Sequence, residues 1–435
     1  MDIRDLIEQK KNGLALSREE IGLIIYGYSS GKISDSKIIE FMRVINSDNF
    51  SYEETYYLAD AMARTGKCLN LKKHFDFVVD KHSAGSYSDS STLIFMSVLA
   101  ELGVKNVKLL SDKYGEYGNT LDRFNVFKKF NAKVSENKLV KILTEVGAGV
   151  IEDSGQFAPV DSKLYALRKK YNIVNEPIIA ASILSKKIAT SSNVVVYDVK
   201  SGEGAIYPSK DFSITLSKYL VEASKLAGIS AAAVISDLNQ PLGASIGSRT
   251  EVEELITVLR SERSLFDASL LEVAKELVIV ALLLTGKASG RSQASEMFDM
   301  AIKTGNALDK FRELLSAYGG VYEDFKHTPG NLLDGVAVSY LTALDSGYVN
   351  DVSIEKFIES YKLLGQLKGG KLDKKAGLQL MVREGVKVNE GDKLVRIFYS
   401  IENRNLPLTL NCLKDAIYIT KNKGQNQKVL HKIIM

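Results

Sequence analysis

The chain has few of the residues that build metal centres and disulfide frameworks. It contains no tryptophan, six prolines, four histidines and two cysteines among 435 residues. Cys68 and Cys412 lie far apart in the sequence, which argues against a disulfide framework and against a cysteine-based metal site. We therefore expect reduced thiols in a cytoplasmic protein.

The chain also lacks a long hydrophobic run and an excess of one charge. Its longest apolar run, residues 277–284, is far shorter than the ~20 residues that span a bilayer, so we expect a buried helix there. The first residues, MDIRDLIEQKKNG, are charged and contain no signal-peptide core. The 57 basic and 53 acidic side chains give a formal net charge of +4. We expect neither a nucleic acid nor a membrane as a partner.

The overall composition is that of an ordinary globular protein. Hydrophobic residues make up 45% of the chain and charged residues 25%. At roughly 150 residues per domain, the length predicts two or three domains.

Helical periodicity dominates residues 1–65. Apolar side chains recur every three or four positions in four segments, 3–10, 18–28, 36–45 and 53–63. Ser17, three residues before Glu20, predicts a capping box at the start of the second helix. This part of the chain should form a small helical bundle.

From residue 75 the pattern changes to alternating strands and helices. Short β-branched runs predict strands in four segments, FDFVVD (75–80), VKLLSD (107–112), NVVVYDVK (193–200) and AAAVISDL (231–238). Helices are expected at 92–103 and 120–130. This alternation predicts a mostly parallel sheet with helices on its faces, which binds ligands at the carboxyl ends of its strands.

A long helical stretch interrupts this pattern, and a β-like segment follows it. The stretch 162–189 could rejoin the N-terminal bundle, which would create a hinge and a cleft. After about residue 335, alternating segments bounded by glycine are typical of a small barrel or sandwich. We expect an α/β fold with a small helical domain (1–65 and 163–193), a larger α/β domain with a mixed or parallel sheet (75–160 and 194–335) and a β-rich C-terminal α+β module (336–435) that packs with the α/β domain.

The segment Lys81–Ser91 lies between an expected strand and an expected helix. It offers one ammonium group, several hydroxyls and the backbone N–H groups around Gly85. Amides at a helix N-terminus attract anions, and a lysine adds a full charge, so the segment suits phosphate. The alternative is a plain turn in which Ser88 or Asp89 caps the next helix.

A second loop, from Ser111 to Thr120, follows the next strand. It supplies two hydroxyls with Gly115 and Gly118 between them. Because both loops follow strands of one sheet, they could converge on one anion. Thr120 could equally be an ordinary helix start.

Three polar side chains stand out on the long helical stretch. Ser182 and Lys186 are four residues apart and share a helix face, and Arg168 lies one helix earlier. Two cations and a hydroxyl could hold a polar planar ligand and stabilise negative charge on it. The alternative is a solvated helix face. His82 is the histidine beside the first loop, and a lone histidine is most often structural.

Six motifs in this order resemble the thymidine and pyrimidine-nucleoside phosphorylase family over nearly the whole chain. They are 80–83 (DKHS), 163–168 (KLYALR), 181–187 (ASILSKK), 198–202 (DVKSG), 237–243 (DLNQPLG) and 376–377 (AG). The resemblance implies a helical and an α/β domain that close over a nucleoside and phosphate, usually in a homodimer. The implied reaction breaks the N-glycosidic bond and yields a free base and a sugar 1-phosphate, without a redox cofactor.

The resemblance also implies roles for individual residues. Arg168, Ser182 and Lys186 would grip the pyrimidine, with His82 near it. The implied phosphate ligands are Lys81, Ser83, Thr92, Ser111 and Thr120. Some family members also hold a potassium ion, and the corresponding positions here are Ser88, Ser90, Leu242, Ser245 and Glu254.

The sequence departs from the family pattern in both phosphate loops. The usual KHSTGGVGD is KHSAGSYSD at residues 81–89, so two of three glycines become serine and Tyr87 replaces a small aliphatic residue. The second loop is one residue shorter and carries Asp112 and Glu116, whose charges oppose an anion. Two alternatives therefore stay open beside phosphorolysis: an acceptor other than phosphate, and a non-catalytic homologue that binds a nucleoside or a partner.

Overall fold

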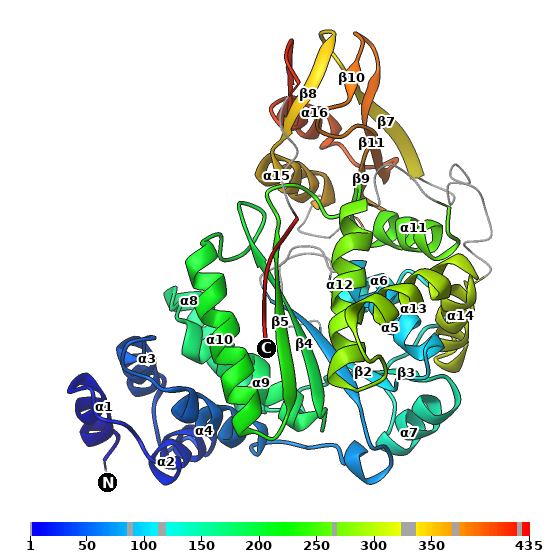
Figure 1. The fold of residues 1–435 in the computed structure, drawn as a ribbon. Helices are drawn as coiled ribbons and strands as arrows, with labels where there is room; N and C mark the ends of the chain where they lie inside the picture. Colours follow the sequence, from blue (N-terminus) through cyan, green and yellow to red (C-terminus); the bar gives the residue numbers. More distant parts are fainter. Residues whose placement is uncertain are drawn as a thin grey trace.

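A computed structural model describes residues 2–84, 90–111, 119–262, 268–322, 336–367, 373, 375–423 and 429–435. Within these residues, no helix is both long and apolar enough to cross a membrane. The helices and strands form an N-terminal bundle, a central sheet with helices on both faces, and a C-terminal β-rich part (Figure 1).

The N-terminal bundle consists of the four helices that the periodicity predicts. Their bounds are α1 (Ile3–Lys11), α2 (Arg18–Ser29), α3 (Asp35–Val44) and α4 (Tyr52–Ala63). The capping box of α2 is confirmed, because the Ser17 hydroxyl accepts a hydrogen bond from the Glu20 N–H and the Glu20 carboxylate accepts one from the Ser17 N–H. Each cap satisfies N–H groups that the first turn of a helix leaves unpaired.

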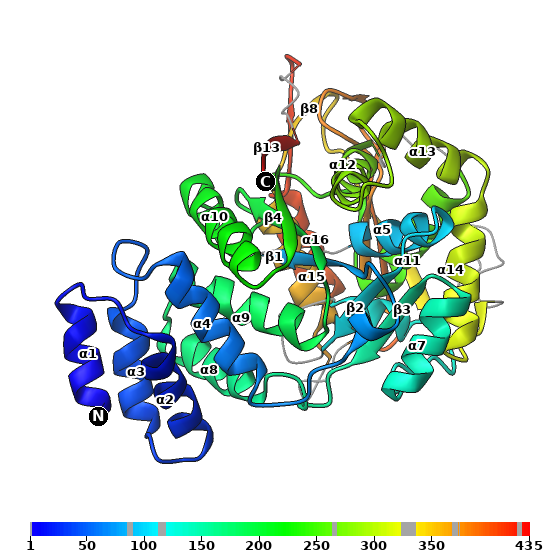
Figure 2. The ribbon, with the colours of Figure 1, turned by 60° about the horizontal axis from the view of Figure 1, so that its bottom comes forward.

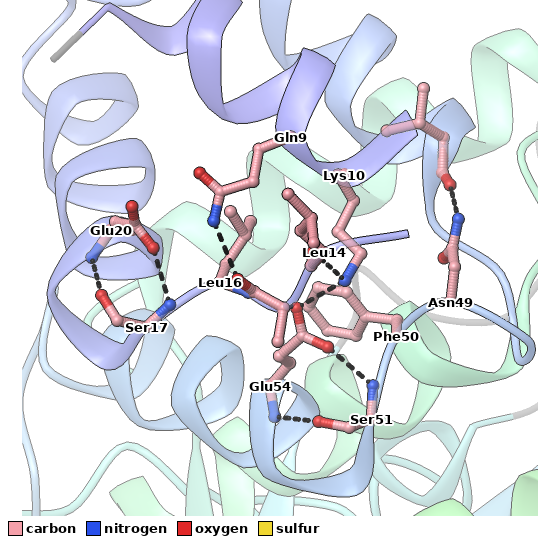
Figure 3. Close-up of polar contacts among 12 residues, drawn as sticks. Gln9, Lys10, Leu14, Leu16, Ser17, Glu20, Asn49, Phe50, Ser51 and Glu54 are labelled. Carbon is pink, nitrogen blue, oxygen red and sulfur yellow. Dashed lines mark hydrogen bonds and ion pairs between the residues drawn. The ribbon is translucent and has the colours of Figure 1, made fainter. Parts of the chain in front are cut away.

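A buried ion pair ties the start of the bundle to α4 (Figure 3). Lys10 Nζ lies 2.7 Å from Glu54 Oε1, and both side chains are almost fully buried. Lys10 also donates to the Leu14 carbonyl at 3.0 Å, and Glu54 Oε1 accepts the Leu16 N–H at 2.8 Å. The Phe50 ring lies 5.4 Å from the ammonium group. Every charge in this cluster therefore has partners, as burial requires.

The central sheet has six strands in the order β13-β5-β4-β1-β2-β3. Five are parallel, and β13 pairs with β5 in the antiparallel direction. The bounds are β1 (Val79–Ala84), β2 (Asn106–Leu110), β3 (Ala148–Glu152), β4 (Val194–Ser201), β5 (Ser230–Asp237) and β13 (Leu430–Ile434). The mostly parallel sheet is confirmed.

Helices cover both faces of this sheet, as Figures 1 and 2 show, and the side chains of each face pack into separate cores. Alternate residues of β4 enter different cores: Val194 and Val196 pack into one, Val195 and Tyr197 into the other. The first core contains α5 (Ser90–Glu101), α11 (Ser248–Leu259), α12 (Ala268–Leu284), α13 (Arg291–Lys303) and α14 (Asn306–Ala317). The second contains the N-terminal bundle with α8 (Pro159–Tyr171), α9 (Glu176–Ala189) and α10 (Lys210–Leu226). Because strand side chains alternate between the two faces, successive residues of β4 enter different cores.

The C-terminal β-rich part contains two small sheets, with strand orders β10-β8-β12 and β6-β9-β11-β7. Its elements are β7 (Val336–Thr342), β8 (Gly347–Val352), α15 (Ile354–Gly365), β9 (Gly377–Leu380), β10 (Lys387–Val388), β11 (Lys393–Ser400), α16 (Leu406–Lys414) and β12 (Ile417–Thr420). The short β6 (Ser245–Ile246), which precedes α11, pairs with β9. That pairing joins this part to the α/β region.

The structure corrects several expected boundaries. The first strand begins at Val79 and continues through Lys81–Ala84, which the sequence pattern had assigned to a loop. The helix expected at 120–130 is the short α6 (Thr120–Phe124). Strand β3 and helix α7 (Glu136–Glu145) were not predicted, and neither was the return of β13 to the central sheet. The 3-10 helix η1 (Leu71–Lys73) precedes β1.

The proposed division into domains stays a prediction. One observation bears on it: the second core contains side chains from both helical segments that the prediction groups together, such as Leu58 and Leu184.

The buried pair in the bundle leads to a stability prediction. Replacing Glu54 with alanine leaves the Lys10 ammonium group buried without its counter-charge, so we expect the free energy of unfolding to fall by about 3–5 kcal/mol. Urea denaturation followed by circular dichroism measures this change. The matched control is Glu53→Ala, which removes an exposed carboxylate one residue earlier. Equal midpoints for the two variants would contradict the prediction.

Candidate active site

Strand β1 directs its polar side chains to opposite faces of the sheet. Lys81 and Ser83 share one face, and Asp80 and His82 share the other, because strand side chains alternate. Val79 packs into the core that contains α5, whereas Ala84 packs into the core that contains the bundle. The strand therefore contributes polar groups to both sides of the sheet within four consecutive residues.

The first group surrounds the Lys81 ammonium group. Lys81 Nζ donates to Ser91 Oγ at 2.9 Å and to Thr92 Oγ1 at 3.0 Å, and it also contacts Ser83 Oγ. Asp198 Oδ2 lies 2.9 Å from the same nitrogen. Ser91 and Thr92 belong to the first turn of α5, so the lysine joins the strand to a helix N-terminus, an arrangement that favours anions.

Asp198 is the centre of this network. Its carboxylate accepts hydrogen bonds from Ser91 at 3.2 Å and Ser83 at 3.4 Å, and its other oxygen contacts Lys200. Lys200 also donates to Ser236 Oγ at 2.7 Å. Burial alone would raise the pKa of Asp198, but Lys200 and Lys81 outweigh burial and hold the pKa below its usual value. The carboxylate therefore stays ionised and fixes both lysines.

A further lysine contacts the backbone of β1 beside this network. Lys108 on β2 is buried and donates to the Lys81 carbonyl at 2.7 Å. Ser111 directly follows β2, and Thr120 begins α6. Residues 112–118 and 85–89, which include Ser88, lie outside the described residues.

Glu251 on α11 connects the ends of the two loops. Its Oε2 accepts Arg123 Nε at 2.6 Å and Ser90 Oγ at 3.0 Å. Arg123 lies one helical turn after Thr120, and Ser90 precedes Ser91. The described ends of both predicted phosphate loops are thus joined through one buried carboxylate.

The second group lies on α8 and α9. Lys186 Nζ is 2.8 Å from Asp161 Oδ2, and both side chains are buried. Ser182 lies one turn before Lys186 and is also buried. Arg168 follows Asp161 on α8 by two turns, which places them on one helix face, and its side chain is only 7% exposed. The alternative of a solvated helix face is therefore wrong.

A further buried ion pair connects α9 to β1. Lys187 Nζ lies 2.7 Å from Asp80 Oδ2, and both side chains are almost completely buried. Lys187 follows Lys186 on α9, and Asp80 precedes Lys81 on β1. His82 shares the face of Asp80 and therefore lies on the side of the sheet that α9 covers.

Six of the predicted site residues thus fall into two groups, on elements that are connected through β1. Lys81 contacts both Ser83 and Thr92 directly. Arg168, Ser182 and Lys186 lie on neighbouring helices that the Lys187–Asp80 pair joins to β1. Their roles in binding remain predictions.

Sequence reasoning missed the carboxylates that hold these lysines, Asp198, Asp161 and Asp80. It also missed Lys200 and Lys108, whereas Ser91 was among the hydroxyls of the segment Lys81–Ser91. One signal was present: Asp198 and Lys200 are charged residues two apart in an otherwise apolar strand, and charges in a buried strand need partners.

A cavity of about 290 Å³ lies elsewhere, between the end of β5 and the C-terminal β-rich part. Its lining includes Asp237, Pro241, Leu242, Arg383 and Glu384. Of the predicted site residues, Leu242 lines it, but none of the residues predicted for the base or phosphate does. We therefore assign the candidate site from the polar networks and not from this cavity.

Comparison with known proteins is consistent with this geometry. A glycosyl transferase family model for an α/β domain matches residues 76–308, and the helical bundle domain model of that family matches residues 4–66. A pyrimidine-nucleoside phosphorylase of Staphylococcus epidermidis is 32% identical over the full length of both chains. The chain belongs to the pyrimidine-nucleoside phosphorylase family.

A second relative supports the same family assignment. A pyrimidine-nucleoside phosphorylase of Geobacillus stearothermophilus is 34% identical over 413 residues, which cover 92% of this chain and 93% of the relative. A more distant likeness concerns the fold alone. The crystal structure of anthranilate phosphoribosyltransferase from Thermus thermophilus superposes with a TM-score of 0.60 at 13% identity and covers 74% of this chain and all of that chain.

The Asp198 network leads to a second stability prediction. In Asp198→Ala the Lys81 and Lys200 ammonium groups lose their shared carboxylate, so we expect the free energy of unfolding to fall by about 3–5 kcal/mol. Urea denaturation at pH 7 measures the loss. The control is Asp211→Ala, which removes an exposed carboxylate from the first turn of α10. A loss no larger than that of the control would show that Asp198 does not hold the two lysines.

Proposed function

We propose that this pyrimidine-nucleoside phosphorylase-like pentosyltransferase uses phosphate as the acceptor and cleaves the N-glycosidic bond of a pyrimidine nucleoside. The observation that carries the proposal is the Lys187–Asp80 pair, because it anchors α9, which carries Lys186, to β1, which carries Lys81 on its opposite face. A nucleoside held by the group on α8 and α9 and phosphate held by the group around Lys81 would then be bound by elements that share β1 as their anchor.

The proposed reaction exchanges one bond at the sugar for another. A phosphate oxygen forms a bond to the anomeric carbon while the bond from that carbon to the base nitrogen breaks. The bonding electrons leave with the base, which becomes anionic and then takes a proton. The products are the free base and a sugar 1-phosphate, and the reverse reaction uses the same groups.

The group around Lys81 suits the acceptor. Lys81, Ser83 and Thr92 would bind phosphate, together with Ser111 and Thr120 from the second loop. Lys81 and Lys200 share the carboxylate of Asp198, so these three side chains together carry a net positive charge before an anion arrives. A preorganised positive site attracts phosphate without reorganisation of its charges.

The group on α8 and α9 suits the leaving base. Arg168 and Lys186 would stabilise the negative charge that develops on the pyrimidine, with Ser182 and His82 beside it. Asp161 fixes the position of the Lys186 ammonium group, which reduces the conformational freedom lost when the base binds. Cations placed in a buried site stabilise developing charge more strongly than in water.

Because both phosphate loops are altered, an acceptor other than phosphate is the alternative. Serines and Tyr87 replace the small residues of the first loop, and residues 85–89 lie outside the described structure. An acceptor of another size would still meet Lys81, Ser83 and Thr92. The loss of catalysis altogether is the remaining alternative.

We also propose that the protein binds a potassium ion with a structural role. The Ser245 hydroxyl is buried and has no hydrogen-bond partner among the described residues. The Glu254 carboxylate accepts hydrogen bonds from the N–H groups of Ala244 and Ser245, which fix its position, and carboxylate oxygens are suitable ligands for a cation. Ser90, Leu242, Ser245 and Glu254 would hold the ion near the ends of the phosphate loops, and Ser88 lies outside the described residues.

The assembly and location are further parts of the proposal. The family resemblance supports a homodimer. The two separated cysteines support a cytoplasmic protein, because thiols stay reduced there.

Phosphate dependence tests the proposal directly. Purified protein is incubated with uridine or thymidine, with and without phosphate, and free base and sugar 1-phosphate are measured by chromatography. We expect base release only with phosphate and in equal amount to the sugar phosphate. Release without phosphate would indicate water or another acceptor, and binding without release would indicate a non-catalytic homologue.

The Lys186 ammonium group gives a sharper prediction. In Lys186→Ala the developing charge on the base loses one of two cations, so we expect kcat/KM to fall by a factor of about 10²–10³, as for the loss of one preorganised donor. Steady-state kinetics with uridine measures the fall. The control is Lys170→Ala, an exposed lysine near the end of α8. Unchanged turnover in Lys186→Ala would remove this lysine from the mechanism.

A further inference from the structure

The carboxylate of Glu251, in the first turn of α11, accepts hydrogen bonds from three different segments of the chain. Its Oε2 accepts Ser90 Oγ at 3.0 Å and Arg123 Nε at 2.6 Å, and its Oε1 accepts the Gly247 N–H at 3.2 Å. The residue is only 2% exposed. These bonds hold the carboxylate firmly, because a buried donor or acceptor that loses its partner is costly. Glu251 therefore ties together the starts of α5 and α11 and the helix α6.

The start of α11 is in turn held by the C-terminal β-rich part. Gly247 has a φ of +121°, and a Cβ at this position would lie 2.7 Å from the Ala376 carbonyl oxygen. A Cβ at Gly377, in β9, would lie 2.5 Å from a side-chain carbon of Thr250. Both positions therefore require glycine for the close approach of α11 and β9. The carboxylate of Glu251 thus sits on a helix whose start is fixed by the C-terminal part.

Ser90 begins α5 and connects Glu251 to the group around Lys81. Lys81 Nζ donates to Ser91 Oγ at 2.9 Å and to Thr92 Oγ1 at 3.0 Å, which are the next two residues of the helix. The first turn of α5 is therefore held by β1 through Lys81 and by α11 through Glu251. The N–H groups in the first turn of a helix can bind an anion, and their direction depends on the orientation of that turn.

The Arg123 guanidinium makes this carboxylate compatible with a nearby anion. Arg123 and Glu251 form an ion pair in which both side chains are 1% exposed. The pair is neutral overall, so Glu251 holds the helix without placing an uncompensated negative charge near the acceptor. Arg123 also belongs to α6, which Thr120 begins, so the same ion pair ties the helix after the second loop to α11.

We propose that Glu251 is a positioning residue for the acceptor and fixes the first turn of α5 in the orientation that binds phosphate. This inference rests on the proposed function, because it requires that phosphate binds at the group around Lys81. Glu251 acts through Ser90 and is not itself a ligand of the acceptor. Its substitution therefore weakens phosphate binding and leaves the nucleoside, which is bound by α8 and α9, almost unaffected.

The test compares Glu251→Gln with Glu253→Gln. Glu253 lies two residues later on α11, and its ion pair of 3.0 Å is with Arg249 of the same helix. The KM for phosphate is measured at saturating uridine, and the KM for uridine at saturating phosphate. We expect Glu251→Gln to raise the KM for phosphate by roughly 5-fold to 10-fold, as for the loss of one hydrogen bond, and to change the KM for uridine by less than about 2-fold. Glu253→Gln should leave both values unchanged.

Ser90→Ala removes the same hydrogen bond from its other end and keeps the ion pair of Glu251 with Arg123. Because both substitutions act on one contact, the double variant should raise the KM for phosphate no further than the larger single effect. If Glu251→Gln does not fold, an unchanged KM for phosphate in Ser90→Ala overturns the inference. Ser90 is also a proposed potassium ligand, so the kinetics are repeated with added potassium chloride. A defect that potassium restores would likewise overturn the inference.

The outcomes separate this inference from the proposed function. If the wild-type protein is active and Glu251→Gln keeps its KM for phosphate, or raises both KM values equally, the inference is wrong and the proposed function stands. If the wild-type protein releases no base with phosphate, the proposed function fails. Calorimetric titration with inorganic phosphate then tests Glu251 alone. Weaker binding by Glu251→Gln supports the positioning role, whereas equal affinities, or no binding by the wild type, overturn it.

Discussion

The Asp80–Lys81 dipeptide is the constraint on which the arrangement of the site depends. Adjacent residues of a strand point to opposite faces, so Asp80 meets Lys187 of α9 while Lys81 meets Asp198 and the first turn of α5. A shift of the register by one residue would exchange the two faces and separate Asp80 from Lys187 and Lys81 from Asp198. The ion pairs therefore fix how the helices on both faces sit relative to the strand.

This arrangement explains why so many charges are buried in one region. A buried ion pair contributes little net stability, because desolvation offsets most of the attraction, but an unpaired buried charge is strongly destabilising. Lys81, Lys186 and Lys187 each have a carboxylate partner. These pairs thus specify geometry more than they stabilise the fold. A site that must hold an anion and a planar base at a set separation requires such a specification.

The sequence predicted the bundle helices and several strands of the sheet. It missed the extension of β1 and the strand β13, which depend on pairing with distant residues. The bundle helices follow from apolar periodicity and from caps such as Ser17 with Glu20. Lys81–Ala84 has no strand-like pattern, and its extended form comes from pairing with β4 across more than one hundred positions. In the site, Lys81 and Ser83 could be predicted from residue type and position, and Thr92 from the family resemblance. Asp198 could not be assigned a role, because a carboxylate near an anion site looks unfavourable until a second lysine, Lys200, is seen on its other oxygen.

The late strand β13 has a consequence for folding. It pairs with β5 although almost two hundred residues separate them, as the register Leu430 with Ser236 shows. Contacts of such high sequence separation form slowly, so β5 is expected to spend part of the folding reaction as an open edge. Open edges of apolar strands are templates for association between chains. During folding, the protein is therefore prone to aggregate until β13 has paired with β5.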